Sequence, residues 1–475
     1  MRIEASLIAA GLLATASALP ATHSPSKDTT GRRVSVEQVR NPNFVPGTRN
    51  GPLALAKIRS KYGQGISENH KNAIERVRLN HAASIRHLNQ KRQSSSDPGD
   101  TDPPIDDGDD DGGDDDDDGD GGDNRDGDGD ISADDHADDD SVTTYPQEGD
   151  AEWIISASIG TPPQVFNLDI DTGSSDLWVF STLLSNDEVN GQHLYNANKS
   201  STAVEMKGYT WDCEYGDGSH SGGVVYQDTV DIGGVTVKGQ AVELASEVSA
   251  QFTKDTNLDG LVGLGFGKLN SIQPKEQKTF FENALGQLDG GFFTADLKHN
   301  TSGKYNFGWL DDQAYTGNIT YVPVDNTEGY WMWTSSGYAV GAIPKTGINK
   351  TAVRGITDTG TTLLLLPDEV VASYYAKVKG ATYSELWMGY VFDCKIAKTG
   401  LFDFTFGTDA THTITVPAEY VNYAVNGDGT CYGAIQSNEG LGFSIFGDIA
   451  IKSAFVIFDE QNVRLGWATK KLGPE

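Results

Sequence analysis

The sequence predicts an all-β protein built from two similar lobes. The first observation is an internal repeat, in which Asp171–Ser175 (DTGSS) recurs 187 residues later as Asp358–Thr362 (DTGTT). The second is that each copy is followed by two apolar residues and a glycine, in Leu261–Gly263 and Ile445–Gly447. These glycines lie 92 and 89 residues after their respective aspartates. A repeat of this length indicates duplicated structural units, so we expect two equivalent lobes.

Local patterns support β-structure after residue 141. Apolar and polar residues alternate with period two in Thr229–Ile232, and the pairs Gly233-Gly234 and Asn426-Gly427 are typical of turns between strands. Helical spacing of apolar residues is rare. It predicts one short helix over 281–288 and a second over 368–378, one in each half of the repeat.

Charge divides the chain into pieces. The 475 residues include 36 basic and 68 acidic side chains, for a net charge of -32, which argues against a nucleic-acid partner. Residues 19–92 hold fourteen basic and four acidic residues, whereas residues 93–141 hold twenty-three aspartates and one arginine. The predicted divisions are a leader segment at 1–18, a basic segment at 19–92, an Asp/Gly-rich disordered segment at 93–141, and the two lobes at 142–325 and 326–475.

The first eighteen residues predict secretion. Met1–Ala18 contains one early arginine, an apolar stretch shorter than the roughly 18 residues that span a bilayer, and small residues at its end. No later stretch is long and apolar enough to cross a membrane, and the C-terminus carries no lipid-anchor tail, so we expect a secreted, soluble protein. Four Asn-X-Ser/Thr triplets are candidate glycosylation sites, at Asn198, Asn300, Asn318 and Asn349.

The basic segment ends at Lys91-Arg92, a dibasic pair suited to a processing protease. Because its charge is opposite to that of the rest of the chain, we interpret it as a removable inhibitory propeptide; the alternative is a basic disordered arm. The acidic segment that follows has almost nothing apolar to bury and is expected to be disordered. Within it, residues 124–135 match a calcium-binding EF-hand loop, but the first ligand is asparagine and no amphipathic helix precedes it. Loose cation association is therefore expected there instead of an ordered calcium site.

The two repeated loops carry the candidate chemistry. Each offers one carboxylate, a glycine that permits a sharp turn, and two hydroxyl residues that can donate hydrogen bonds to the carboxylate. If the repeat brings Asp171 and Asp358 together, both cannot remain charged, so they share a proton. The ionised carboxylate can then take a proton from water while the neutral one hydrogen-bonds a substrate carbonyl, which leads to amide hydrolysis. This chemistry needs no metal, cofactor or nucleophilic side chain. Asp169 could share a strand face with Asp171 and is expected in the cleft wall, because Ile356 stands at the equivalent position.

Five motifs together resemble the pepsin-like aspartic endopeptidases, and in particular their secreted fungal branch. The motifs are Asp171–Val179, Tyr215–Ser219, Asp259–Gly265, Asp358–Thr362 and Phe446–Asp448. The resemblance covers about residues 142–475 and implies a bilobal fold with one catalytic aspartate in each lobe. It leaves Cys213, and also Ile170 and Thr357 before the two aspartates, as departures from the commonest family pattern.

The resemblance also implies roles for individual residues. Asp171 and Asp358 would form the catalytic dyad, supported by hydrogen bonds from Ser174 and Thr361 beside Gly173 and Gly360, and Thr172 and Thr359 would hold the two lobes together as an interlobe grip. A flap that covers the substrate would consist of Tyr215, Gly216, Asp217 and Ser219, with Trp178 as the partner of Tyr215 and Leu261 as a further cleft residue. Cys394 and Cys431 would form a disulfide. Asp217 and Ser219 match those members of the fungal branch that cleave after Lys as well as after bulky apolar residues. The alternative for Asp217 is that it only stabilises the turn.

The propeptide contains a further match. Gly51–Gly63 resembles the end of the family's inhibitory prosegment, which implies that Lys61 and Tyr62 enter the cleft and that acid releases them. We therefore predict an acid-active endopeptidase made as a zymogen, a monomer whose partners are polypeptide substrates and its own propeptide, without nucleic acid or membrane. The alternatives are a catalytically silent pepsin-like binding or inhibitory protein, an acidic cation-binding extracellular protein, and an anchored processing protease, which the lack of a lipid-anchor tail disfavours.

Overall fold

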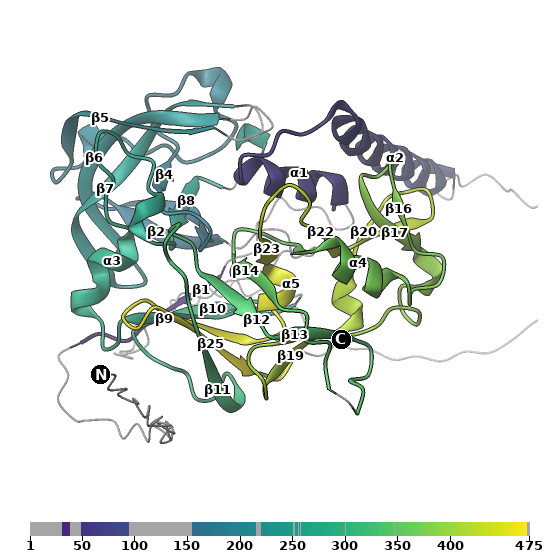
Figure 1. The fold of residues 1–475 in the computed structure, drawn as a ribbon. Coiled ribbons are helices and arrows are strands. Elements are labelled where there is room, and N and C mark those ends of the chain that lie inside the picture. Colours follow the sequence, from purple (N-terminus) through teal and green to yellow (C-terminus); the bar gives the residue numbers. More distant parts are fainter. Residues whose placement is uncertain are drawn as a thin grey trace, which may run out of the picture. The chain divides into compact units, whose positions relative to one another are not determined.

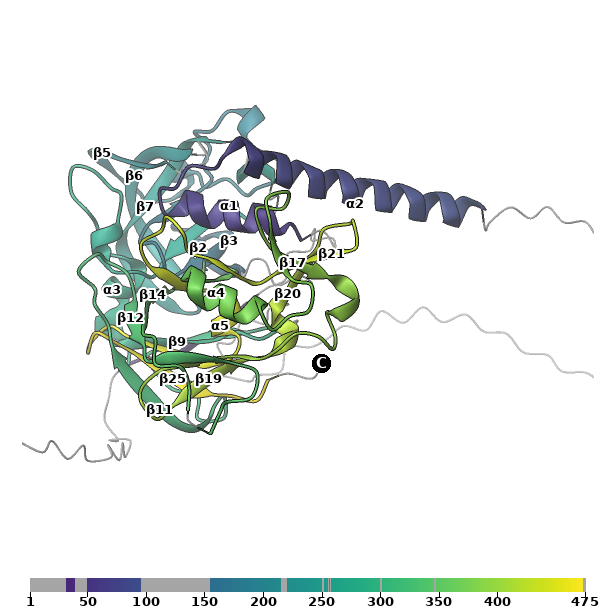
Figure 2. The same ribbon diagram turned by 45° about the vertical axis from the view of Figure 1, so that its right-hand side comes forward.

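The computed structural model describes residues 31–38, 49–94, 154–214, 220–249, 252–254, 256, 258–299, 301–345 and 347–472. Several predictions lie outside these residues: the signal peptide, the acidic segment beyond Ser94, the flap at 215–219 and the triplet asparagine Asn300. Figures 1 and 2 show the arrangement of the described helices and strands.

One lobe is formed by a seven-stranded sheet. Its strands are ordered β2-β3-β8-β4-β7-β6-β5, and β2 also pairs with β6. Their bounds are β2 Ile154–Ile159, β3 Gln164–Asp171, β4 Leu177–Val179, β5 Val204–Glu214, β6 His220–Ile232, β7 Val235–Val248 and β8 Gly260–Gly263. The predicted alternation at Thr229–Ile232 falls on β6, where Val230 and Ile232 are buried, and Gly233-Gly234 forms the turn to β7.

The other lobe contains three smaller sheets. The five-stranded sheet is ordered β12-β14-β23-β15-β22, the three-stranded sheet β13-β18-β19 and the four-stranded sheet β16-β17-β21-β20. Their bounds are β12 Met332–Ser335, β13 Gly337–Val340, β14 Val353–Thr357, β15 Leu364–Leu366, β16 Thr382–Ser384, β17 Gly389–Asp393, β18 Phe404–Gly407, β19 Thr413–Val416, β20 Asn422–Val425, β21 Thr430–Gly433, β22 Ile435–Ser437 and β23 Ser444–Phe446.

The sequence repeat corresponds to a repeated strand arrangement. In the first lobe β3 is parallel to β8 and β8 is antiparallel to β4; in the second β14 is parallel to β23 and β23 is antiparallel to β15. Asp171 stands opposite Gly263, and Thr357, the residue before Asp358, stands opposite Phe446, the residue before Gly447. The predicted two-lobed β fold is therefore confirmed. Asp171 ends β3 opposite the glycine that ends β8, whereas Asp358 and Gly447 directly follow the ends of β14 and β23.

A six-stranded sheet includes strands from both halves of the repeat and one from the basic segment. Its order is β1-β10-β9-β24-β25-β11. The bounds are β1 Val34–Glu37, β9 Phe292–Asp296, β10 Lys304–Phe307, β11 Thr316–Pro323, β24 Phe455–Asp459 and β25 Arg464–Thr469. Phe293 and Phe458, from the two halves, stack with ring centroids 4.7 Å apart, so this sheet holds the halves together through a shared core.

The described residues include five α-helices, α1 Gly51–Lys61, α2 Glu68–Ser94, α3 Phe280–Ala284, α4 Asp368–Tyr375 and α5 Asp448–Ile451. α3 and α4 confirm the two predicted helices, although both end early. After α3 the chain tightens into a 3-10 turn at Leu285–Gln287, which contains the poor helix former Gly286. Helices α1 and α2 were not predicted. No helix in the described ranges is long and apolar enough to cross a membrane.

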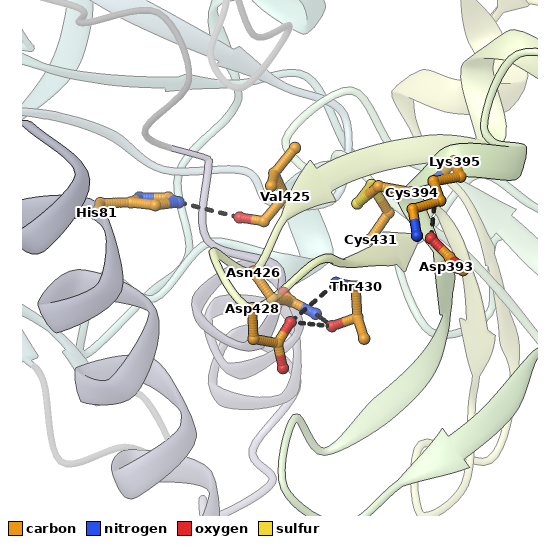
Figure 3. Close-up of a disulfide and its surroundings, with 9 residues drawn as sticks. All are labelled: His81, Asp393, Cys394, Lys395, Val425, Asn426, Asp428, Thr430 and Cys431. Carbon is orange, nitrogen blue, oxygen red and sulfur yellow. Dashed lines mark hydrogen bonds between the residues drawn. A yellow bond between two sulfur atoms is a disulfide. The ribbon is translucent and has the colours of Figure 1, made fainter. Parts of the chain in front are cut away.

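A disulfide fixes the hairpin that contacts α2 (Figure 3). Cys394, just after β17, is bonded to Cys431 in β21, with the two Cα atoms 5.0 Å apart. On the neighbouring strand β20, the carbonyl of Val425 accepts a hydrogen bond from His81 Nε2 at 2.9 Å. Asn80 of α2 donates to the next carbonyl, Asn426, at 2.8 Å. The basic segment is thus attached to this hairpin by backbone-directed contacts.

Candidate active site

The first repeated loop holds Asp171 at the end of β3. The carboxyl is buried, and it accepts hydrogen bonds from Ser174 Oγ at 2.6 Å and from the Gly173 backbone N–H at 2.8 Å. These donors fix both oxygens of the carboxyl, because Ser174 reaches Oδ2 and Gly173 reaches Oδ1. The hydroxyl support expected for Ser174 is present.

The second loop repeats this pattern around Asp358. Its buried carboxyl accepts a hydrogen bond from the Gly360 N–H at 3.0 Å and another from the Thr361 hydroxyl. The donors occupy the same positions relative to the aspartate as those of the first loop. The two carboxyls therefore have equivalent local supports, one from each lobe.

Two threonines lock the loops to each other. Thr172 Oγ1 donates to the carbonyl of Thr357 at 2.9 Å and accepts from the N–H of Thr359 at 3.0 Å. Reciprocally, Thr359 Oγ1 donates to the carbonyl of Ile170 at 2.8 Å and accepts from the Thr172 N–H at 3.1 Å. Four buried hydrogen bonds thus fix the separation of the loops, as the expected interlobe grip requires.

Close approach explains the glycines of the two loops. A Cβ on Gly173 would lie 2.5 Å from Asp358 Oδ1, and a Cβ on Gly360 would lie 2.4 Å from Asp171 Oδ1. Neither glycine has the positive φ that would by itself require glycine. Both glycines lie in turns, as predicted, and the structure adds a further reason for them: a side chain on either loop would fill the space where the opposite carboxyl lies.

Lys61, the last residue of α1, lies between the two carboxyls. Its ammonium Nζ donates to Asp171 Oδ1 at 2.7 Å and to both oxygens of Asp358 at 2.9 Å. The next residue, Tyr62, donates its phenol proton to Asp358 Oδ2 at 2.7 Å. The ammonium therefore bridges the two carboxyls.

Burial and the Lys61 charge act on the pKa values in opposite directions. Burial raises the pKa of Asp171 to about 6, even though the Lys61 ammonium acts to lower it. Burial also opposes ionisation of Asp358, but Lys61, Thr361 and Tyr62 together hold its pKa below the ordinary value. For Lys61, burial alone would lower the pKa, and the two carboxylates raise it. With Lys61 bound, Asp358 is thus the aspartate that ionises more readily.

An aromatic pocket receives the Tyr62 ring. Tyr330 and Phe443 contact it edge-on, with ring centroids 5.8 Å and 5.4 Å away, and they also contact each other at 5.7 Å. Sequence reasoning did not identify Tyr330 or Phe443. Neither belongs to a repeated motif, and they lie 113 residues apart in the chain, so only the fold brings them together.

The remaining residues predicted to line the cleft are Trp178, Asp169 and Leu261, and their positions are as follows. Trp178 of β4 is buried and stacks with Trp211, the ring centroids being 6.0 Å apart. Its Nε1 has no hydrogen-bond partner among the described residues, and Tyr215, its expected partner, lies outside them. Asp169 and Leu261 are register partners on β3 and β8 and are partly exposed. Whether they touch substrate stays a prediction.

Two buried aspartates on equivalent loops, each supported by a hydroxyl and a backbone N–H, form the site of an aspartic endopeptidase. The chain belongs to the eukaryotic aspartyl protease family, whose pattern it matches over residues 152–470. Among the fungal pepsins it is 50% identical to endothiapepsin of Cryphonectria parasitica over 334 residues, 70% of this chain and 78% of that protein. It is 47% identical to penicillopepsin-1 of Penicillium janthinellum over 328 residues, 69% of this chain and 98% of the relative.

A solved structure supports the fold. The aspartic proteinase from Irpex lacteus superimposes with a TM-score of 0.56 at 24% sequence identity, covering 68% of this chain and 95% of the other. The protein is therefore a pepsin-like aspartic endopeptidase that acts on polypeptides.

Proposed function

We propose that the protein is a secreted acid endopeptidase made as an autoinhibited zymogen, with Asp171 and Asp358 as its catalytic pair. The observation that carries the proposal is the position of Lys61, whose ammonium bridges both carboxyls at 2.7 to 2.9 Å. An ammonium held there excludes water from the space between the aspartates and neutralises their charge. The chain with Lys61 in place is thus the inactive precursor.

Removal of Lys61 would leave room for a water molecule between the carboxyls. The ionised aspartate takes a proton from this water while the neutral one donates a hydrogen bond to the scissile carbonyl. Attack of the water oxygen on the carbonyl carbon gives a tetrahedral diol. Transfer of a proton to the amide nitrogen then allows the C–N bond to break, which releases a carboxylic acid and an amine.

Contacts over much of its length support inhibition by the basic segment. At one end, β1 pairs with β10, and Arg32 donates to the Gly234 carbonyl at 2.7 Å. In the middle, Gly51 approaches the ring of Tyr432 so closely that a Cβ there would lie 2.2 Å from it. Beyond the cleft, Gln64 donates to the Gly440 carbonyl at 2.7 Å.

Acid is the expected trigger for release. Lys61 lowers the pKa of both aspartates, so loss of Lys61 raises both values. The bound form therefore holds fewer protons than the released form, and protonation favours release. The pKa of Asp358 is lowered in the bound form, so this aspartate stabilises the bound form fully at pH values above its ordinary pKa near 4. That stabilisation is lost as the pH falls through the lowered pKa.

Secretion and processing complete the proposal. The signal peptide at 1–18 would direct export, and cleavage after Lys91-Arg92, in the last part of α2, would separate the basic segment. Asn198, Asn318 and Asn349 are exposed, as glycan acceptors must be. The preference for bulky apolar residues around the scissile bond, with Lys accepted before it, is part of the same proposal.

The proposal can be tested by acidifying the secreted precursor. Samples held at a series of pH values are followed in parallel by gel electrophoresis and by hydrolysis of a denatured protein. The proposal predicts that chain shortening and proteolysis begin together as the pH falls. Full proteolysis by the intact precursor at neutral pH would contradict autoinhibition, while leaving the family assignment unaffected.

A further inference from the structure

A second pair of carboxyls lies behind the first catalytic loop. Asp176 and Glu243 are 5% and 0% exposed, and a single amide nitrogen, Nδ2 of Asn270, lies 2.8 Å from Asp176 Oδ1 and 3.0 Å from Glu243 Oε1. Asp176 lies five residues after Asp171, directly before β4, while Glu243 belongs to β7, which pairs with β4. Two buried carboxylates that share one donor in this way cannot both stay charged without a neighbouring cation, so one of them carries a proton.

The surroundings of the pair supply no positive charge. Asn270 Nδ2 donates to Asp176 Oδ1 at 2.8 Å and to Glu243 Oε1 at 3.0 Å, while Ser271 N–H donates to Asp176 Oδ1 at 2.7 Å. From β5, Cys213 Sγ donates to Asp176 Oδ2 at 3.3 Å, which adds a titratable but uncharged group to the contacts of Asp176. No lysine, arginine or histidine among the described residues forms an ion pair with either carboxyl.

The proton is assigned to Glu243. Its oxygen Oε2 is buried without a hydrogen-bond donor among the described residues, whereas Asp176 accepts from three donors. Asn270 cannot turn to present its carbonyl instead, because that oxygen already accepts from the Gln277 N–H at 2.8 Å. Burial raises the pKa of Glu243, and the negative charge of Asp176 raises it further. Burial also raises the pKa of Asp176, against the hydrogen bonds that it accepts.

The pair is connected to the catalytic loop through the backbone. Asn270 Nδ2 also donates to the Ser175 carbonyl at 3.3 Å, and the Asp176 carbonyl accepts from Gly263 N–H at 2.7 Å. Gly263 is the glycine that stands opposite Asp171 in the sheet. Any movement that separated two charged carboxyls here would therefore shift the loop that aims Asp171.

We propose that Asp176 and Glu243 form a proton-sharing structural pair that positions the Asp171 loop and confines the folded lobe to acid pH. The role in positioning rests on the proposed function, but the effect on folding does not. In this account, ionisation of Glu243 leaves two buried negative charges with no cation to compensate them. The highest pH at which the protein stays folded and active then depends on this buried pair as well as on the catalytic aspartates.

The direction of the pH effect follows from the protons bound in each state. An unfolded glutamate loses its proton above about pH 4, whereas the folded pair keeps it, so the folded state holds one extra proton. The pair therefore stabilises the folded state fully below the ordinary pKa of glutamate, and this stabilisation is lost progressively as the pH rises above that pKa. For one proton, the folded-to-unfolded ratio changes about tenfold for each pH unit.

The test measures urea unfolding of the full-length precursor by tryptophan fluorescence between about pH 4.5 and pH 7. The variant Glu243→Gln keeps the shape and a donor toward Asp176 but cannot ionise. Its unfolding equilibrium constant is expected to rise with pH less steeply than that of the wild type. The difference between the two slopes should be about one power of ten per pH unit. The control Glu205→Gln, at an exposed position in β5 of the same sheet, should retain the wild-type slope.

A second variant and an activity measurement complete the test. Asp176→Asn removes the other carboxyl and should also flatten the pH dependence. After removal of the basic segment, Glu243→Gln should retain activity through neutral incubations that inactivate the wild type. Wild-type pH slopes in both variants would overturn the proposal, and so would failure of both to fold at acid pH, because each preserves a donor between the side chains. A chain without proteolytic activity would refute the proposed function but would leave the unfolding comparison valid.

Discussion

Replacement of Lys61 by methionine is the perturbation that most directly addresses autoinhibition. Methionine keeps most of the length of the side chain and removes its charge. The Lys61 side chain is 14% exposed and its two partners 3% and 0%, so the ion pairs are shielded from solvent. Breaking a buried ion pair by removing one partner costs about 3 kcal/mol at the low end, which corresponds to about a hundredfold change in an equilibrium constant.

The assay compares the precursors at mildly acidic pH, where the wild type is expected to remain closed. Cleavage of a fluorogenic peptide and shortening of the chain should both begin at higher pH in Lys61→Met, with initial activity about a hundredfold above that of the wild type. Lys57→Met, which removes an exposed charge from the same helix, is the matched control and should behave as the wild type. A Lys61→Met precursor with the wild-type acid requirement would refute the reasoning.

Three further changes have defined outcomes. Tyr62→Phe removes one donor to Asp358 and should weaken inhibition by about 1.5 kcal/mol, so its activation pH should lie between those of the wild type and Lys61→Met; an unchanged activation profile would count against that contact. Joint replacement of Cys394 and Cys431 by serine opens a loop of 37 residues and should lower the free energy of unfolding by about 3 to 4 kcal/mol in denaturant titrations, an effect that equal midpoints would exclude. Asn198→Gln should reduce the mass of the secreted protein by one glycan, whereas an unchanged mass would show that this exposed site is unused.

The repeated loops could be predicted because their chemistry is local. Each Asp-Thr-Gly carries its own supporting hydroxyl within three residues, and the pairing of Asp171 with Asp358 follows from the repeat. The position of Lys61 was inferred from a family resemblance, since nothing in the spacing of a lysine 110 residues before Asp171 indicates contact. The sequence therefore predicted the roles of the loop residues directly, whereas it indicated the contact with Lys61 only through the family resemblance.

Other features depend on contacts between distant segments. Asp176 and Glu243 lie 67 residues apart, and a sequence pattern does not distinguish a buried glutamate on a strand from an exposed one. Gly173 is required by the approach of the opposite carboxyl, which only the folded pair of lobes creates. Helix α1 packs Leu55 and Ile58 against the main core, and this packing, more than its intrinsic propensity, accounts for a helix that local patterns did not indicate.

The central claim, that Asp171 and Asp358 together activate water, is tested most directly by single replacements of each aspartate. Wild type, Asp171→Asn and Asp358→Asn precursors are cleaved in trans after Lys91-Arg92 by a dibasic-specific protease, so that maturation does not depend on their own activity. Hydrolysis of a denatured protein is then measured across acid to neutral pH, with folding verified by fluorescence. The account predicts acid activity in the wild type and its loss in both folded variants. Acid activity that survives either replacement, or its absence from the processed wild type, would contradict it.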